Sequence, residues 1–245
     1  MTPIVLIPAR MAASRLPGKP LADIAGVSLI VRVLRQAQAA GIGPVAVAAG
    51  DPQIVEAVER AGGRAVLTDP ALPSGSDRIL AALEALDPEG RHDAVINLQG
   101  DIPFADPGMV IAVADLLAAK AGCDIATLIA PEASPADRDN PDVAKAVVAF
   151  DEDGKTARAL YFTRSTLYGD GPVWTHIGIY GYRRDALKRF TAARPSPLEL
   201  RERLEQLRAL ELGLTVWASV VASRPIEVNN PADLAAARAF AGATR

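Results

Sequence analysis

The sequence predicts an α/β fold organised around a mainly parallel sheet. Short continuous apolar runs at residues 4–7, 45–49 and 94–98 alternate with longer segments of helical period. Continuous runs are typical of strands buried on both faces, and the strand–helix–strand order places helices on both sides of a parallel sheet. The chain has 245 residues, of which 50% are hydrophobic, so it can bury a full core.

The first half of the chain alternates strands with helices. Ser28 is placed to cap the first helix, Asp51 followed by Pro52 the second, and Ser76 or Asp77 the third. We expect strands over residues 4–7, 45–49, 65–67 and 94–98, and helices over residues 29–40, 52–61, about 77–86, and from Pro107 onward.

The second half changes character and predicts a smaller lobe. We expect strands over residues 124–130, 146–150, 157–161 and 176–182, a loop over 131–142, and amphipathic helices over 197–212 and 231–241. No repeat or linker composition is visible. One domain is therefore expected, with a first half of residues 1–122, a lobe of residues 123–228 and a C-terminal helix within residues 229–245.

Composition excludes several classes of protein. The 26 lysines and arginines against 29 aspartates and glutamates give a net charge of −3, which argues against nucleic-acid and anionic-membrane partners. A single cysteine, Cys123, excludes an internal disulfide, and two histidines leave little for a histidine metal cage. No apolar run has the length of a signal-peptide core or a membrane span, so we expect a cytoplasmic protein.

Three cations follow the first strand within ten residues. Arg10, Arg15 and Lys19 lie in a loop that also contains Gly18. Ligands of open α/β sheets bind at the carboxyl ends of the strands, and fixed cations there suit a polyphosphate. The spacing is neither the dinucleotide glycine fingerprint nor a Walker P-loop. The alternative is a solvated basic loop.

One carboxylate follows a second buried strand. Asp101 comes directly after residues 94–98 and Gly100, and a carboxylate in this position can hold Mg²⁺ between triphosphate oxygens. The alternative is a cap for the helix that begins near Pro107. Ser74 and Gly75, with Arg78 one turn further on, can read a pyrimidine edge, although an ordinary helix cap fits their spacing equally well.

Several segments, spread in order over nearly the whole chain, resemble one enzyme family. They are residues 7–21 (IPARMAASRLPGKPL), 73–78 (PSGSDR), 97–101 (NLQGD), 159–164 (ALYFTR), 176–183 (HIGIYGYR), 195–199 (PSPLE) and 204–208 (LEQLR). Together they are similar to the 3-deoxy-manno-octulosonate cytidylyltransferases, also called CMP-Kdo synthetases. The resemblance implies a Rossmann-like three-layer nucleotidyltransferase fold with a mixed, mainly parallel sheet and a smaller dimerisation lobe.

The resemblance also implies a reaction and a nucleotide site. CMP is transferred from CTP to 3-deoxy-D-manno-octulosonate (Kdo), pyrophosphate is released, and the product serves lipopolysaccharide biosynthesis. Arg10, Lys19 and Asp101 are the implied catalytic residues, and Asp101 and Asn229 hold Mg²⁺ or Mn²⁺. The implied nucleotide-binding residues are Pro8, Ala9, Arg10, Ser14, Arg15, Lys19, Ser74, Gly75, Arg78 and Gln99.

The implied sugar site lies in the second lobe, which is also the implied interface of a homodimer. His176 and Tyr180 are four residues apart in a strand, so they point to one face. Taken alone, they are more typical of a satisfied core histidine and a core aromatic residue. Adjacent residues on a helix, such as Glu205 and Gln206, face different directions, and a solvated surface is the alternative there. The implied sugar-binding residues are Arg164, His176, Tyr180, Glu205 and Gln206.

The sequence departs from the family pattern near its end. The family motif Val-Asp-Thr-Pro-x-Asp-Leu appears as residues 228–234 (VNNPADL), so Asn229 replaces a metal-binding aspartate, and Asp233 is expected to start a helix. Residues 165–170 and Ile102 are smaller departures. Two alternatives therefore stay open: an enzyme for a related ulosonic acid, and a nucleotide-binding paralogue with impaired catalysis. A nucleotide-sugar glycosyltransferase fits less well, because a paired-aspartate motif is missing after Gly100.

Overall fold

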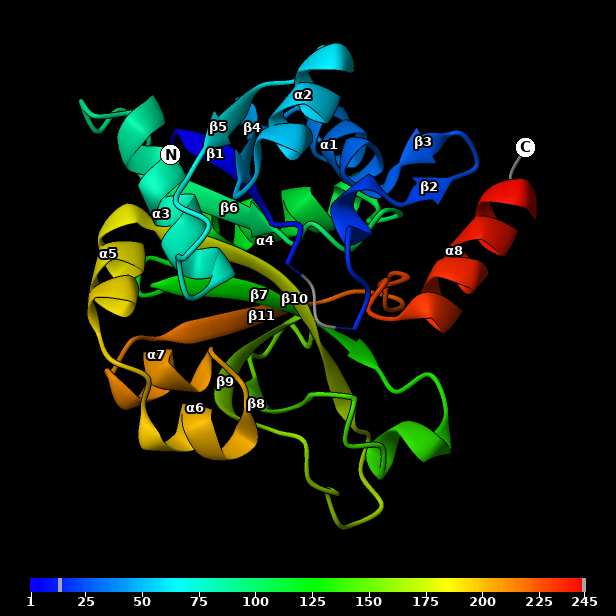
Figure 1. Cartoon of the computed structure of the whole chain (residues 1–245). Helices are drawn as coiled ribbons and strands as arrows, with labels where there is room; N and C mark the ends of the chain where they lie inside the picture. Colours follow the sequence, from blue (N-terminus) through cyan, green and yellow to red (C-terminus); the bar gives the residue numbers. More distant parts are fainter. Residues whose placement is uncertain (13–14, 244–245) are drawn as a thin grey trace. The chain divides into compact units, whose positions relative to one another are not determined.

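The computed structural model describes residues 1–12 and 15–243 (Figure 1). The chain divides into two compact units: Met1–Ile111 with Pro225–Arg245 form unit 1, and Ala112–Arg224 form unit 2. The boundaries expected from the sequence lay after residues 122 and 228. The C-terminal helix, Pro231–Ala243, belongs with the first half of the chain in unit 1.

Unit 1 contains a parallel sheet. Its strands are β1 (Pro3–Ala9), β4 (Val45–Ala49), β5 (Ala65–Leu67) and β6 (Ala94–Leu98), in the order β5-β4-β1-β6. The inner strand β1 pairs with β4 and β6, and Val5, Leu6 and Ile7 have no exposed surface. This double burial explains the continuous apolar run.

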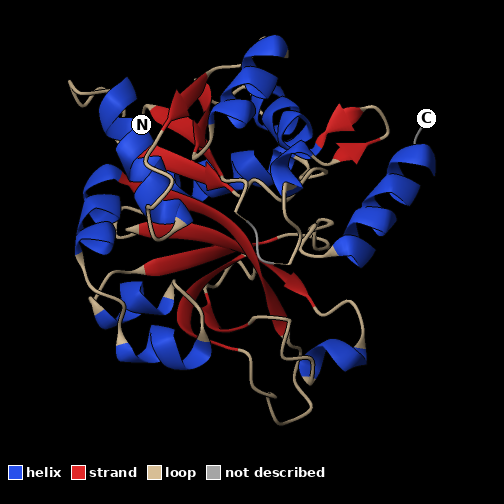
Figure 2. Cartoon of the chain, viewed as in Figure 1, coloured by secondary structure: helices blue, strands red, loops and turns tan. Residues whose placement is uncertain are grey.

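The helices of unit 1 accompany these strands, as Figure 2 shows in blue. They are η1 (Lys19–Leu21), α1 (Leu29–Ala39), α2 (Pro52–Arg60), α3 (Gly75–Leu86) and α8 (Pro231–Ala243), while α4 (Pro107–Ala119) begins in unit 1 and ends in unit 2.

A short hairpin was not foreseen from the sequence. Strands β2 (Asp23–Ile24) and β3 (Val27–Ser28) pair antiparallel across Ala25 and Gly26, whose φ angles are 52° and 82°. Two consecutive positive φ values are what a tight two-residue hairpin turn requires. Helix α8 lies beside this hairpin, where Arg238 Nε donates to Asp23 O at 2.9 Å (Figure 1).

The expected helix caps differ in detail from the observed ones. Ser28 is the N-cap residue of α1 but makes no side-chain cap hydrogen bond, and the other two caps differ further. Asp51 has the extended backbone of an N-cap, but its carboxylate makes no cap bond and instead accepts Met11 N–H at 2.7 Å. Helix α3 is capped by Ser74, not by Ser76 or Asp77, because Ser74 Oγ accepts Asp77 N–H at 3.1 Å. Both differences bear on the site described below.

Unit 2 contains a mixed sheet that is mostly antiparallel. Its strands are β7 (Ile125–Pro131), β8 (Lys145–Phe150), β9 (Thr156–Thr163), β10 (Trp174–Arg183) and β11 (Val216–Val220), in the order β10-β7-β11-β9-β8. Only the β7–β11 pairing is parallel among the pairings of these strands in the described residues. A mixed α/β fold is confirmed, but the mainly parallel character holds for unit 1 alone.

The expected helix over residues 197–212 is wrong, because the segment forms two shorter helices. Helix α6 (Pro197–Glu202) ends at Arg203, whose φ of 56° is left-handed, and α7 (Leu207–Glu211) follows. The buried Arg208 reaches back to Glu199 with two hydrogen bonds of 2.7 and 2.6 Å. This bidentate pair holds the two helices in the broken arrangement. The remaining helices are η2 (Pro135–Arg138) and α5 (Arg184–Ala192).

No helix in the described part of the chain is long and apolar enough to cross a membrane.

Candidate functional site

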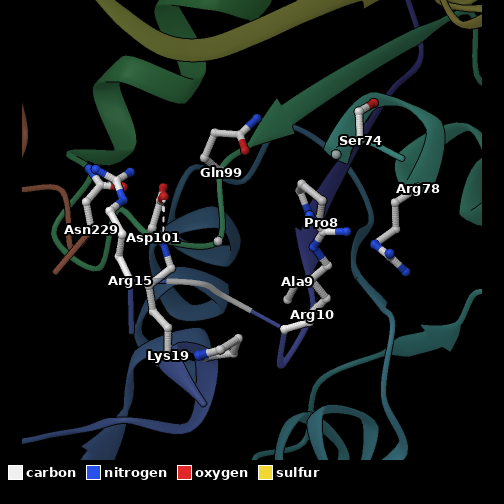
Figure 3. Close-up of a pocket in the computed structure, with 14 residues that line it drawn as sticks. Pro8, Ala9, Arg10, Arg15, Lys19, Ser74, Arg78, Gln99, Asp101 and Asn229 are labelled. Carbon is white, nitrogen blue, oxygen red and sulfur yellow. Dashed lines mark hydrogen bonds and ion pairs between the residues drawn. The ribbon is translucent and has the colours of Figure 1, made fainter. Parts of the chain in front are cut away.

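A pocket of about 360 Å³ lies in unit 1, where β1 and β6 end and α3 begins (Figure 3). Parallel strands bring their carboxyl ends to one edge of the sheet, so the loops after β1 and β6 converge there. The pocket is lined by Pro8, Ala9, Arg10, Ala12, Arg15, Lys19, Pro20, Ser74, Gly75, Arg78, Gln99, Gly100, Asp101 and Asn229.

The structure therefore brings the expected nucleotide and metal residues together. All the described members of both sets line the pocket, while Ser14 lies outside the described residues. Pro20 and Ala12 were not foreseen as lining residues, although both belong to the same cationic loop. Figure 3 shows Lys19, Asp101 and Asn229 toward one end and Ser74 and Arg78 toward the other.

Two glycines allow the pocket walls to approach one another. A Cβ on Gly100 would lie 2.5 Å from the carbonyl oxygen of Pro8, and a Cβ on Gly75 would lie 3.3 Å from Pro8 Cγ. The first distance is a clash with backbone, so Gly100 is required for the ends of β1 and β6 to lie this close.

One cation of the loop is paired and two are not. Lys19 Nζ lies 2.9 Å from Asp101 Oδ2, and both side chains are partly exposed (Figure 3). Arg10 and Arg15 form no ion pair with any residue that the structure describes. The pocket thus presents two uncompensated guanidinium groups, which favour a bound polyanion.

Arg78 forms part of the pocket wall, and hydrogen bonds hold its guanidinium in place. Its side chain is 2% exposed, and its guanidinium donates to Thr68 Oγ1 at 2.6 Å and to Asp69 O at 3.0 Å. Burial, followed by the positive charge of Arg10, lowers the pKa of Arg78. Arg78 therefore fixes residues 68–70 through hydrogen bonds and adds positive charge to the lining of the pocket.

The opposite end of the pocket is fixed by two polar pairs. Ser74 Oγ caps α3 and also donates to Asp77 Oδ2 at 2.6 Å, so the hydroxyl is engaged and the backbone at Gly75 faces the pocket. Gln99 Nε2 donates to Asn97 Oδ1 at 3.2 Å, which holds the Gln99 amide against the buried end of β6. A fixed amide is what recognition of a nucleobase edge requires.

Sequence reasoning missed Asp51, because Asp-Pro at a helix start is an ordinary capping signal. Its carboxylate instead accepts the N–H of Met11, the residue after Arg10. Gly50 precedes it, and a Cβ there would lie 2.8 Å from Arg78 Nη1 and 3.1 Å from Arg10 Cβ. Asp51 thus anchors the cationic loop at the point where it leaves β1.

Asn229 is held beside Asp101 by backbone contacts. Val228 N–H donates to Asp101 O at 2.9 Å, and the N–H groups of Asn229 and Asn230 donate to Asp233 Oδ2 at 2.8 and 3.1 Å. Asp233 N–H in turn donates to Asn230 Oδ1 at 3.0 Å. The prediction that Asp233 starts a helix is confirmed, so its carboxylate is not a substitute ligand.

The donor set of the pocket fits Mg²⁺ that arrives with a triphosphate. In the residues that the structure describes, no three histidine, cysteine, aspartate or glutamate side chains are placed to hold a metal ion by themselves. Mg²⁺ is commonly held by one or two protein oxygen ligands together with substrate phosphates. Asp101 and Asn229 offer a carboxylate and an amide oxygen on the same pocket wall.

Three of the expected sugar-binding residues of unit 2, His176, Tyr180 and Gln206, form one contact group. The His176 ring lies 5.4 Å from the Tyr180 ring, which confirms that both point to one face, and Gln206 Nε2 lies 3.4 Å from His176 Nδ1. Thr127 Oγ1 contacts His176 Nε2 at 2.9 Å. Burial lowers the pKa of His176 to about 3, so the ring is neutral at physiological pH.

Glu205 and Arg164 have other contacts in unit 2. Glu205 Oε1 is 3.6 Å from Arg208, which joins it to the α6–α7 ion pair. Arg164 donates to the carbonyl oxygens of Pro141 and Asp142 and lines a separate open hollow of unit 2. That hollow is also lined by Asp139, Ser165, Thr166, Tyr168, Arg201, Glu202 and Arg203.

Comparison with known proteins agrees with the pocket. The family model described as cytidylyltransferase matches residues 4–216, which is most of the chain. Together with a parallel unit whose strand ends gather cations and a carboxylate, this match defines the class as a nucleotidyltransferase enzyme.

Relatives that align over nearly the whole chain identify the family within this class. The chain is 55% identical to the 3-deoxy-manno-octulosonate cytidylyltransferase of Parvibaculum lavamentivorans, over 97% of this chain and 92% of the relative. It is also 55% identical to the enzyme of that name in Rhodospirillum centenum, over 97% and 93%. A solved structure of a CMP:2-keto-3-deoxy-manno-octonic acid synthetase complexed with CTP is 34% identical over all of both chains, with a TM-score of 0.91. The chain belongs to the 3-deoxy-manno-octulosonate cytidylyltransferase family.

Proposed function

We propose that the chain transfers CMP from CTP to Kdo and releases pyrophosphate, as a step toward lipopolysaccharide. The observation that carries this proposal is the unit 1 pocket, which combines two uncompensated arginines with the Lys19–Asp101 pair. Family membership supports the choice of CTP and of Kdo.

The residues of the pocket act by positioning and by charge. Arg10, Arg15 and Lys19 bind the triphosphate and neutralise the charge that develops on the leaving pyrophosphate. Asp101 and Asn229 would hold Mg²⁺ or Mn²⁺, which would supply electrophilic polarisation of the α-phosphate. Because Lys19 contacts Asp101 at 2.9 Å, Lys19 is placed to turn to phosphate when the carboxylate takes the cation.

The base end of the pocket supports cytosine recognition. Gln99 is held by Asn97, and a Cβ on Gly75 at the start of α3 would lie 3.7 Å from Gln99 Oε1. Pro8 lies against Gly75 and closes the side of this end. The backbone of residues 74–75 and the Gln99 amide then offer the hydrogen bonds that distinguish cytosine from the other bases.

In unit 2, the contact group of His176, Tyr180 and Gln206 is the proposed sugar site. A neutral imidazole, an aromatic ring and an amide suit the hydroxyls of a sugar, since one ring nitrogen donates and the other accepts. Arg164 is the proposed partner of the sugar carboxylate. Its hydrogen bonds to the carbonyl oxygens of residues 141 and 142 hold its side chain at the open hollow of unit 2.

A pyrophosphate-release assay with CTP, Kdo and Mg²⁺ or Mn²⁺ tests the proposal. We expect release that requires both substrates and the metal ion. Release with another ulosonic acid but not with Kdo would select the second candidate, an enzyme for a related acid, which the departures at residues 165–170 favour. Binding of CTP without release for any acid would identify a paralogue with impaired catalysis.

The proposal extends to assembly and location. Unit 2, with its exposed Leu160 and Leu200, is the proposed surface of a homodimer, and sedimentation as a monomer would contradict this. The cytoplasm is the proposed location, because nucleoside triphosphates are found there. Fractionation of cells with an antibody against the chain would test it.

A further inference from the structure

We propose that Glu227 is the positioning residue of the metal end of the pocket. Its carboxylate holds the amide of Asn229 so that Oδ1 is turned away from Glu227, and it supplies the negative charge that the asparagine lacks. This inference rests on the proposed function, because it concerns the cation that accompanies the triphosphate.

The local backbone sets Glu227 and Asn229 on one side of the chain. Val228 has no exposed surface and its N–H bonds to Asp101 O, whereas Glu227 is exposed and Asn229 is half-buried. Alternate burial of this kind places the side chains of residues two apart on the same side of an extended segment. Asn229 Nδ2 donates to Glu227 Oε2 at 3.4 Å, so the two side chains meet.

Two other carboxylates near Asn229, those of Asp233 and Asp101, bind other partners. Asp233 accepts the N–H groups of Asn229 and Asn230 as the start of α8. Asp101 faces Lys19. Glu227 is therefore the acidic side chain that contacts the Asn229 amide itself.

This contact has two consequences for a cation. An amide has its nitrogen and oxygen on opposite sides, so engagement of Nδ2 by Glu227 leaves Oδ1 to face another partner. A carboxylate on the nitrogen also polarises the amide, which makes Oδ1 a better ligand for a hard cation. The pair thus replaces one aspartate: Asn229 supplies the oxygen that binds the cation, and Glu227 supplies the negative charge.

Titration of the full chain with Mn²⁺, in the presence of CTP and without sugar acid, tests this role by electron paramagnetic resonance. We expect Glu227→Gln to weaken Mn²⁺ binding about threefold to tenfold, because the charge is lost. Glu227→Ala should weaken it further, because the acceptor is lost as well. Glu56→Gln is the matched control, since Glu56 is an exposed glutamate of unit 1 whose ion pair with Arg60 lies on α2.

Binding of CTP without metal separates this role from a structural one. Removal of a negative charge beside the triphosphate should leave CTP affinity unchanged or tighten it, whereas local unfolding would weaken both ligands. In an Asn229→Asp background, Glu227→Gln should have a smaller effect on Mn²⁺, because the new carboxylate needs no orienting partner.

Equal Mn²⁺ affinity for Glu227→Gln and Glu56→Gln would overturn the inference, as would parallel weakening of CTP and Mn²⁺. Absence of Mn²⁺ binding by the unchanged chain with CTP would also overturn it. A chain that shows the expected Mn²⁺ effects but releases no pyrophosphate would contradict the proposed function and leave the inference standing.

Discussion

The two units differ in how they place the residues expected to form a site. In unit 1, residues from four separate segments of the chain (the loop after β1, the start of α3, the end of β6 and the segment before α8) line one pocket. In unit 2, His176 contacts Tyr180 and Gln206, Glu205 reaches Arg208, and Arg164 lines an open hollow. Parallel strands force their following loops together, whereas a mostly antiparallel sheet does not.

The largest expected effect on activity comes from removal of the carboxylate of the unit 1 pocket. We expect Asp101→Asn to lower kcat/KM by about 100-fold or more, because the cation loses its charged ligand and Lys19 loses its partner. Steady-state pyrophosphate release measures the loss. The exposed Asp115→Asn is the control, and a similar kcat/KM for both variants would remove Asp101 from the site.

In unit 2, the largest expected effect is on stability. Arg208 is 6% exposed, bonds Glu199 twice and stacks 4.7 Å from the Phe190 ring. Burial alone would raise the pKa of Glu199, but hydrogen bonds from Arg208 and Ser196 outweigh it and lower the pKa. Arg208→Met should therefore lower the free energy of unfolding by about 3 kcal/mol, since it leaves a buried carboxylate unpaired.

Chemical denaturation at pH 7 checks the Arg208 prediction. The exposed Arg201→Met is the control, because its side chain is 64% exposed on the same helix pair. A loss of less than 1 kcal/mol for Arg208→Met would show that the break between α6 and α7 does not depend on the ion pair.

The half-buried imidazole of His176 leads to a pH-dependent prediction. The pKa of His176 is about 3 in the folded protein against an ordinary value of 6.5, so below pH 6.5 the unfolded state takes up the proton first. Stability should be complete above pH 6.5 and fall as the pH drops toward 3. His176→Gln should reduce the fall between pH 7 and pH 4.5 by about 2 kcal/mol.

Denaturation midpoints of both proteins at the two pH values measure this difference. An equal fall in the free energy of unfolding of the two proteins would mean that the His176 ring takes up a proton in the folded state. That result would indicate that this cluster is an open sugar site.

The smallest expected effect tests the anchor of the cationic loop. Asp51→Ala removes the acceptor of Met11 N–H and should raise the KM for CTP about fivefold, which corresponds to about 1 kcal/mol for one hydrogen bond. Glu56→Gln on the same helix should not change it. A KM equal to that of the unchanged chain would show that the loop needs no anchor at residue 51.

How far the sequence could predict the structure also differs between the units. The expected strands 45–49, 65–67 and 94–98 coincide with β4, β5 and β6. Strands β4 and β6 are almost wholly buried and leave a continuous apolar signal, whereas β5 is a short edge strand. The position of the pocket follows from those strand ends. The engagement of Asp51 with Met11 does not, because it joins residues 40 apart whose spacing carries no local signal.

In unit 2, long-range contacts override the local pattern. Residues 197–212 have helical period, yet Arg203 turns left-handed where the Arg208–Glu199 pair crosses the break. Strand β11 and helix α5 were not foreseen from the sequence. Ile102, where the family often has glutamate, is 1% exposed, so that departure belongs to the core and not to the pocket.

The most direct test of the unit 1 pocket is calorimetric titration with CTP and Mg²⁺. Arg10 is exposed at the end of β1 and forms no ion pair with a described residue, so Arg10→Ala should weaken CTP binding at least tenfold. The exposed Arg35→Ala on α1 carries the same change of net charge and should bind like the unchanged chain. Equal affinities of the two variants for CTP would contradict the placement of the triphosphate in this pocket.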